Sequence, residues 1–115
     1  MTVVLVGTAT WQRKHVDWEI ASSLRDAPLN PRSGLVGIIL PSYQALHPPG
    51  TYDVQTIPAR LADNIACGYA KLYGWTENAE EIAEVIHEAY LARRTKKPDH
   101  SRLLMRRNSA GQRWW

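Results

Sequence analysis

The sequence predicts an α/β fold in which a parallel sheet is flanked by helices, and three observations support this prediction. Two short apolar runs, residues 2–6 and 35–40, have the composition of strands buried in a parallel sheet. Between them, Val16, Ile20 and Leu24 recur at four-residue spacing, which places them on one face of a helix. A cluster of proline, asparagine, serine and glycine separates that helix from the second run. At 115 residues, the chain has room for one such domain.

The first strand is expected at the centre of the sheet. Its run TVVLV is β-branched and apolar without alternation, which is typical of a strand covered on both faces. The link GTAT follows, and its hydroxyls suit a helix cap or a ligand contact. The second run, LVGIIL, ends before Pro41. Two buried strands joined by a helix predict a right-handed crossover between parallel neighbours.

The chain beyond Pro41 has fewer regular patterns. The stretch between Pro41 and Pro58 shows no helical or strand period and predicts a loop that is longer than most connections. Pro58 is expected in the first turn of a short helix over residues 59–65. Residues 69–75 predict a third, shorter strand.

The clearest helix is predicted over residues 77–94. Its apolar residues fall on one face, its first turns are acidic and its end is basic, as the helix dipole favours. Asn78 and Glu81 have the spacing of a capping box, which predicts the start of the helix.

The composition indicates a globular protein of the cytoplasm. Hydrophobic residues make up 44% and charged residues 22%, close to the averages for such proteins. No apolar run approaches the ~20 residues that span a bilayer, and the apolar start is too short for the core of a signal peptide. The single cysteine, Cys67, excludes an internal disulfide.

The charge is divided unevenly, which separates an expected domain, residues 1–95, from a basic C-terminal tail, residues 96–115. From Arg93 onward the chain carries eight basic residues and one acid, Asp99. Such a tail is compatible with contact to nucleic-acid phosphates, with a solvated arm and with a subunit contact. Its apolar residues favour packing of some part of it; they are Leu103, Leu104, Met105, Trp114 and Trp115.

The sequence lacks the familiar phosphate-binding motifs GxxxxGK[ST] and GxGxxG. His15 and Glu19 share a helix face, but HVDWE is not HExxH and no third ligand is evident, so no metal is expected. Glu19 follows Trp18 on a helix that leaves the carboxyl end of a parallel strand, where ligands collect in open sheets. On this pattern alone, Glu19 is either a ligand-facing acid or an ordinary solvated helix residue.

Four segments resemble the TIR-like domains of Thoeris-type anti-phage defence proteins. They are TVVLVGTATWQRKHVDWEI (2–20), GLVGIIL (34–40), TIPARLADNI (56–65) and YAKLYGW (69–75). The resemblance extends over about three quarters of the chain. It implies a flavodoxin-like fold and an activity on NAD, and it makes Glu19 the match to the family's catalytic glutamate.

The chemistry that the resemblance implies is cleavage of the nicotinamide–ribose bond of NAD, which serves as the substrate. The product is ADP-ribose or a related signal, formed through an oxocarbenium-like ribose that a carboxylate stabilises. The residues expected to line the pocket are Thr8, Thr10, Trp11, His15 and Trp18. Trp11 is alternatively a core residue. His15 stands where relatives carry an aromatic residue, which affects the pocket wall and its response to pH.

The resemblance also implies an incomplete domain. The family's domain begins with a further strand, a loop and helices, whereas Met1 here directly precedes the VLVG strand. An unpaired strand edge is then expected, which invites self-association or pairing with a partner TIR protein. The enzymatic hypothesis requires that the missing strand, loop and helices be supplied. The alternatives are a catalytically silent TIR-like module that regulates a partner and a nucleic-acid binder that uses the basic tail.

Overall fold

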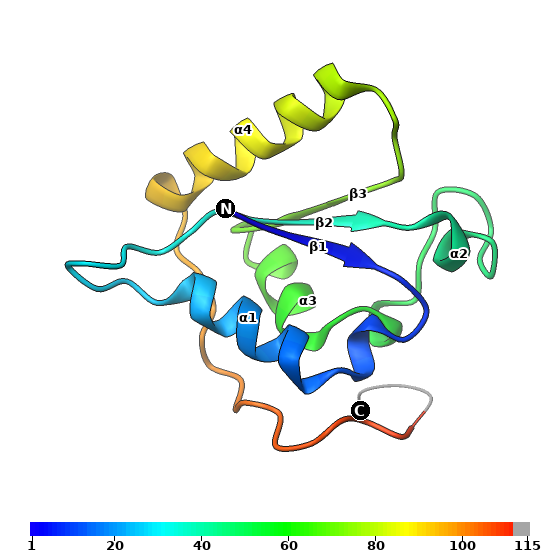
Figure 1. Ribbon diagram of the computed structural model, residues 1–115, viewed down its shortest axis with the longest axis horizontal. Coiled ribbons are helices and arrows are strands. Elements are labelled where there is room, and N and C mark those ends of the chain that lie inside the picture. Colours follow the sequence, from blue (N-terminus) through cyan, green and yellow to red (C-terminus); the bar gives the residue numbers. More distant parts are fainter. Residues whose placement is uncertain (112–115) are drawn as a thin grey trace.

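The computed structural model describes residues 1–111 (Figure 1). Residues 112–115, which include Trp114 and Trp115 of the expected tail, lie outside the described part. In chain order the elements are β1 (Thr2–Val6), η1 (Thr10–Gln12), α1 (Lys14–Leu24), β2 (Leu35–Ile39), α2 (Pro41–Gln44), η2 (Val54–Thr56), α3 (Ala59–Ala66), β3 (Lys71–Tyr73) and α4 (Ala79–Thr95).

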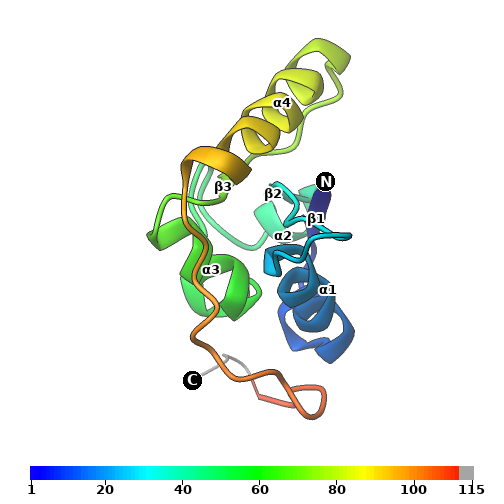
Figure 2. The ribbon, with the colours of Figure 1, turned by 90° about the vertical axis from the view of Figure 1, so that its left-hand side faces the viewer.

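The three strands form one parallel sheet in the order β1-β2-β3. Helices α1 and α3 lie on one face of the sheet and α4 lies on the other, as Figure 2 shows. The chain therefore has the predicted α/β architecture of a parallel sheet flanked by helices, in keeping with a flavodoxin-like fold. The strands are in sequence order because both crossovers have the same hand and pass over the same face, so each new strand is added next to the preceding one.

The core lies between the sheet and the α1–α3 layer. Ile20 and Leu24 of α1 are completely buried, and Val16 packs against the same cluster. This confirms the apolar face predicted for the first helix. The other members of the cluster include Val4, Val6, Leu35, Ile39, Tyr43, Ile57, Leu61, Ala62, Tyr69 and Ala70.

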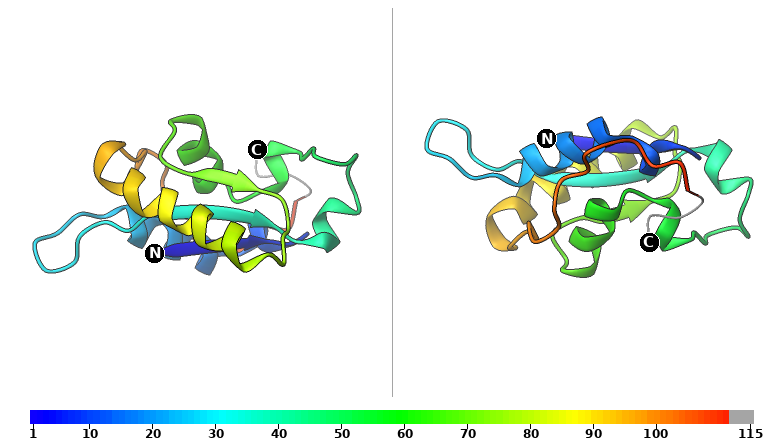
Figure 3. Two further views of the ribbon diagram at one scale, coloured as in Figure 1. Left: turned by 90° about the horizontal axis from the view of Figure 1, so that it is seen from above. Right: turned by 90° about the horizontal axis from the view of Figure 1, so that it is seen from below.

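The prediction that β1 is a central strand covered on both faces is wrong. Strand β2 is central and all five of its residues are buried, whereas β1 lies at one edge of the described sheet. Val4 and Val6 of β1 face the core, but Val3 is 37% and Leu5 50% exposed. The opposite face of β1 is only partly covered, because α4 crosses the sheet diagonally and contacts chiefly β2 (Figure 3, left).

Helix α4 confirms the predicted second amphipathic helix with a start two residues later. The Asn78 side chain accepts hydrogen bonds from the backbone N–H groups of Glu80 and Glu81, which caps the helix. The predicted capping box is only half formed, because the Glu81 carboxylate accepts a hydrogen bond from Thr76 instead. Near its other end the helix approaches β2 closely. A Cβ at Gly34 would lie 2.5 Å from the carbonyl oxygen of Ala89, so a side chain there would displace α4.

The segment between Pro41 and Pro58 is less irregular than predicted. It holds the helical turn α2, which begins at Pro41, and the 3-10 turn η2. The two turns are joined by Tyr43, whose ring is buried and whose hydroxyl lies 2.7 Å from the hydroxyl of Thr56. One buried aromatic residue with a hydrogen-bonded hydroxyl thus organises a stretch that has no sequence period.

Helix α3 matches the prediction for residues 59–65 within one residue, with Pro58 at the N-cap. Strand β3 is shorter than the predicted 69–75, because it pairs with β2 over three residues only. Trp75 lies beyond β3 and is 48% exposed.

Residues 97–111, here called the C-terminal strap, run along α3 and then beneath α1 (Figure 2; Figure 3, right). The strap lies over a buried ion pair between the two helices. Arg60 of α3 donates to Asp17 of α1 over 2.8 Å, and their side chains are 2% and 6% exposed. Asp17 also accepts the backbone N–H of Met105 at 2.9 Å. The described part of the basic tail is therefore packed against the domain.

Candidate functional site

Glu19 lies on the exposed side of α1 that faces the free edge of β1. Its exposure follows from the helical period, because the side chain of the neighbouring Ile20 points into the core. Its side chain lines a small cavity of about 110 Å³ between α1 and the edge strand. The other lining residues are Thr2, Val3, Val4, Leu5, Thr10, Val16 and Ile20.

A second, more polar hollow adjoins Glu19 on the other side. Around it lie Thr2, Ser22, Ser23, Asn30, Pro31 and Ser33. The hydroxyls of Thr2 and Ser23 are hydrogen-bonded to each other, which ties the start of β1 to α1. Ser22 and Asn30 are exposed, so their polar groups are accessible beside the carboxylate. Glu19 is thus bordered by hydroxyl and amide groups of the kind that hold a sugar.

Within residues 1–111 the carboxylate of Glu19 has no hydrogen-bond or ion-pair partner. This distinguishes it from Asp17 and Asp63 of the same helix layer, which are paired with Arg60 and Arg102. A carboxylate without a structural partner is available to a ligand.

Thr10 contacts the same cavity, but its hydroxyl already has partners. The Thr10 hydroxyl accepts the backbone N–H of Gly7 at 2.8 Å and donates to the carbonyl of Leu5 at 3.2 Å. These two hydrogen bonds fold the turn after β1. Thr10 therefore shapes the end of the strand beside Glu19.

Thr8 and Trp11 border a different hollow, at the carboxyl end of the sheet. Trp11 is 4% exposed, which places most of its ring in the interior. The hollow is also lined by Gln12, Tyr43, Leu46, His47, Thr56 and Gly111. Glu19 is not among its lining residues. The predicted pocket is therefore divided, with Thr10 beside Glu19 and Thr8 and Trp11 in the hollow at the strand ends.

Tyr43 and His47 also line the hollow at the strand ends, and the sequence did not predict them as site residues. Their rings are stacked with centroids 4.4 Å apart. The two residues are four positions apart, so helical spacing is the signal that points to them. The sequence does not reveal this spacing as helical, because the stretch between Pro41 and Pro58 has the composition of a loop.

His15 and Trp18 line none of these three hollows. Their rings meet edge to face with centroids 5.2 Å apart, and the indole N–H of Trp18 donates to the carbonyl of Met105 at 2.8 Å. The ammonium group of Lys14 lies 5.3 Å from the centre of the Trp18 ring. Trp18 therefore faces the C-terminal strap, whereas Glu19 faces β1.

Another, mostly apolar cavity of about 260 Å³ lies between α4 and the β2–β3 side of the sheet. Its acid is Glu88, which accepts a hydrogen bond from the Tyr73 hydroxyl at 2.8 Å and pairs with Lys71 at 3.6 Å. The hydrogen bond from Tyr73 holds the pKa of Glu88 below its usual value. Burial and the bond to Glu88 raise the pKa of Tyr73 to about 12. Both groups are bonded to each other and connect α4 to β3. The carboxylate in this cavity is therefore already occupied, unlike that of Glu19.

No group of three or more histidine, cysteine, aspartate and glutamate side chains within residues 1–111 is placed to hold a metal ion. Over the same residues, no helix is long and apolar enough to cross a membrane.

Comparison with known proteins places a similarity at the start of the chain. Residues 1–45 match the model of the TIR-like domain of the Thoeris protein ThsB. The matched segment contains β1, α1, β2 and α2, and Glu19 lies within it. No curated protein and no solved structure gives a match to the chain. The similarity therefore includes the edge strand, the helix that carries Glu19 and the central strand.

Proposed function

We propose that this chain is a TIR-like NAD-processing protein of anti-phage defence, and that Glu19 carries its chemistry. One observation supports this proposal above the others. Glu19 falls within the segment similar to a TIR-like domain, and its carboxylate is free of partners in the described chain while it lines a hollow at the edge of the sheet.

The proposed reaction breaks the bond between nicotinamide and ribose. As that bond lengthens, positive charge develops on the ribose ring, and a nearby carboxylate stabilises it electrostatically. Glu19 takes this role, and it also holds the ribose hydroxyls. Ser22 and Asn30 border the same carboxylate and suit further contacts with the sugar. Water or a hydroxyl of the substrate then captures the ribose, which gives ADP-ribose or a cyclised product.

The size of the cavity indicates how much of NAD it receives. Pockets that enclose a whole small molecule have volumes of roughly 300–1,000 Å³. Glu19 borders both the cavity of about 110 Å³ beside β1 and the polar hollow of about 340 Å³ beside Ser22 and Asn30, and the second volume lies within that range. We propose further that a second copy of the chain or a partner TIR protein pairs along the free edge of β1 and forms an additional wall of the site.

The test compares Glu19→Gln with Glu84→Gln. Glu84 is an exposed glutamate on α4, so its substitution removes the same charge away from the cavity. We expect wild type and Glu84→Gln to release nicotinamide from NAD at equal rates and Glu19→Gln to be slower by about 100-fold or more. The measurement is chromatography of the products, which also separates ADP-ribose from cyclised forms.

Two results would contradict the proposal. One is the absence of nicotinamide release by the wild type at every protein concentration tried. The other is an equal rate for Glu19→Gln and wild type. A rate that rises more steeply than the protein concentration supports completion of the site by a second copy.

A further inference from the structure

The C-terminal strap is fixed in place by hydrogen bonds to α3 over its first half. The Asn64 side chain accepts the backbone N–H of Asp99 at 2.8 Å and donates to its carbonyl at 3.1 Å. Arg102 forms a two-pronged pair with Asp63, at 2.7 and 2.9 Å. Arg60 donates to the carbonyl oxygens of Arg102 and Leu103. These hydrogen bonds, several of which involve charged groups, fix the position of the strap on α3.

The second half of the strap is held against the start of α1. The indole of Trp18 donates to the carbonyl of Met105, and the side-chain oxygen of Asn108 accepts the backbone N–H of Lys14 at 3.0 Å. The backbone N–H of Ser109 donates to the carbonyl of Gln12 at 2.8 Å. The strap therefore runs antiparallel to residues 12–18.

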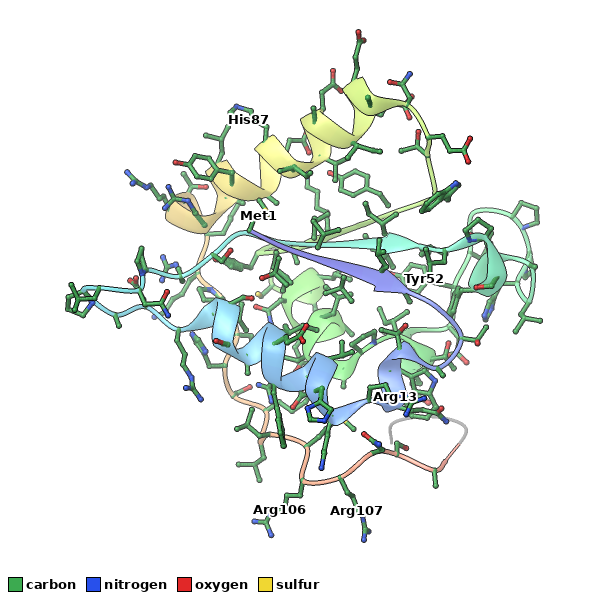
Figure 4. All side chains as sticks on the ribbon, viewed as in Figure 1. Met1, Arg13, Tyr52, His87, Arg106 and Arg107 are labelled. Atoms are coloured by element: carbon green, nitrogen blue, oxygen red, sulfur yellow. The ribbon has the colours of Figure 1, made fainter. Side chains whose placement is uncertain are left out.

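This path brings together basic residues that are far apart in the sequence. Arg106 and Arg107 lie between the strap's contacts with Trp18 and Lys14, and their side chains extend away from the body of the molecule (Figure 4). Arg13 and Lys14 come from the start of α1. We call Arg13, Lys14, Arg106 and Arg107 the cationic cluster. Within residues 1–111, none of the four is in an ion pair.

The acids near the cluster do not neutralise it. Asp17 is buried and its charge is balanced by Arg60. Glu19 faces β1 on another side of α1. Lys14 begins an eleven-residue helix, whose N-terminus adds partial positive charge to the cluster. Among residues 1–111, the surface is therefore cationic and no carboxylate is paired with the four basic side chains.

An aromatic side chain lies among these charges. Trp18 is 39% exposed, with the Lys14 ammonium 5.3 Å from its ring centre and His15 packed against it edge to face. Cations bind the phosphates of any nucleic acid, but an exposed ring adds stacking only with bases that are unpaired. This combination favours a single strand over a duplex.

We propose that the cationic cluster and Trp18 form a binding surface for single-stranded nucleic acid. Arg106 and Arg107 of the strap, together with Arg13 and Lys14 of α1, contact successive phosphates, and Trp18 contacts a base. The surface is separate from the cavity at Glu19, so this inference does not depend on the proposed action on NAD.

The test measures binding of a fluorescent single-stranded oligothymidine to the full chain by anisotropy over a series of salt concentrations. The first variant is Arg106→Gln with Arg107→Gln, which removes two exposed charges that support no contact within the described residues. The matched control is Lys96→Gln with Lys97→Gln, which removes two charges where α4 ends and the strap begins, at the opposite end of the strap from Arg106 and Arg107. Circular dichroism checks that both variants are folded.

We expect the Arg106 and Arg107 variant to bind about tenfold more weakly at low salt, and the slope of log affinity against log salt to become shallower by ~1.4, because each phosphate contact to a single strand contributes about 0.7. The control is expected to bind within about twofold of wild type. Equal losses in the two variants, or no binding of the oligothymidine by wild type, would overturn the proposal.

Two further ligands test the preference for unpaired bases. A duplex of equal length is expected to bind more weakly than the single strand, and inorganic polyphosphate at equal phosphate concentration is expected to compete poorly. Equal or tighter binding of the duplex overturns the choice of a single strand. Equal competition by polyphosphate overturns the role of Trp18, since that ligand has no bases to stack.

Discussion

The ion pair of Arg60 and Asp17 is the polar centre of the layer formed by α1 and α3. Both side chains are almost fully buried, and each one has further partners in the strap. Arg60 donates to two strap carbonyls and Asp17 accepts one strap N–H, so both charges are hydrogen-bonded on several sides. Burying two charges is tolerable when hydrogen bonds satisfy them in this way.

Removal of one partner from this pair is expected to be costly. Arg60→Met leaves the Asp17 carboxylate buried without its counter-ion, and we expect the free energy of unfolding to fall by about 3–5 kcal/mol. Urea denaturation followed by circular dichroism gives the value. Combining Arg60→Met with Asp17→Leu is expected to recover part of the loss, since no uncompensated charge remains.

A comparison with Arg102 provides the control. Its pair with Asp63 is more accessible to solvent, with side chains 35% and 20% exposed, and Arg102→Gln is expected to cost ~1 kcal/mol or less. Equal losses for Arg60→Met and Arg102→Gln would show that burial of the pair is not what sets its contribution.

The sequence predicts the exposure of Glu19 but not the pairing of Asp17. Helical spacing is local, so the burial of Ile20 and the exposure of its neighbour follow from the period alone. Asp17 and Arg60 are 43 residues apart, and no local pattern joins them. Trp18 directly precedes Glu19 in the chain, yet its indole faces the strap, and no local pattern reveals that contact.

At the scale of elements, β1 is an edge strand without the features that protect such strands from pairing. It carries no charged residue and no proline, and Val3 and Leu5 are exposed. Natural edge strands commonly carry charge, proline or a bulge, each of which discourages pairing with another chain. The open edge also borders the cavity at Glu19.

We therefore expect the chain to self-associate through β1. Val3→Lys places a charge on the exposed face of this edge strand and is expected to shift the protein toward monomer with little change in stability. Analytical ultracentrifugation over a range of concentrations measures the effect. Thr51→Lys, in an exposed loop away from the sheet, adds the same charge as a control. A wild-type protein that stays monomeric throughout contradicts the expectation.

The sequence located β1 correctly but not its position in the sheet. An apolar run without alternation usually marks a strand with cover on both faces. Here the cover on one face is incomplete because α4 crosses β2, and that placement depends on contacts such as the close approach at Gly34. The direction of a helix across a sheet is a tertiary property, and the run TVVLV carries no signal of it.

Across the whole molecule, the two faces of the sheet are packed unequally. The α1–α3 face contains the continuous core, whereas Ala89 is the one buried residue of α4, all of which lies in the described chain. The other links between α4 and the remainder are polar and more exposed. They include the Tyr73–Glu88 hydrogen bond and a bond from Arg32 to the carbonyl of Arg93.

Helix α4 is accordingly expected to open before the rest of the domain. Amide hydrogens in its middle should exchange faster than those of α3 and β2, because local opening exposes little apolar surface. Hydrogen exchange followed by mass spectrometry tests this. Ala89→Gly is expected to accelerate exchange in α4 while leaving β2 unchanged. Equal protection of α4 and β2 in the wild type would mean that the fold opens as one unit.

The overall topology followed from the sequence because it depends on local periods and on the handedness of crossovers. The strap did not. Its residues have no period, and its path is set by hydrogen bonds to Asp17, Asn64 and Asp63 on helices that precede it by many residues.

The strap also affects the order in which the molecule is completed during translation. Arg60 and Asp17 are synthesised early, but the carbonyl of Leu103 and the N–H of Met105 that satisfy them emerge from the ribosome much later. Until then, the nascent α1–α3 layer has a charged pair without its full set of partners, and water or a chaperone must serve in their place. The polar centre of the α1–α3 layer is therefore completed only after residues 103–105 have left the ribosome.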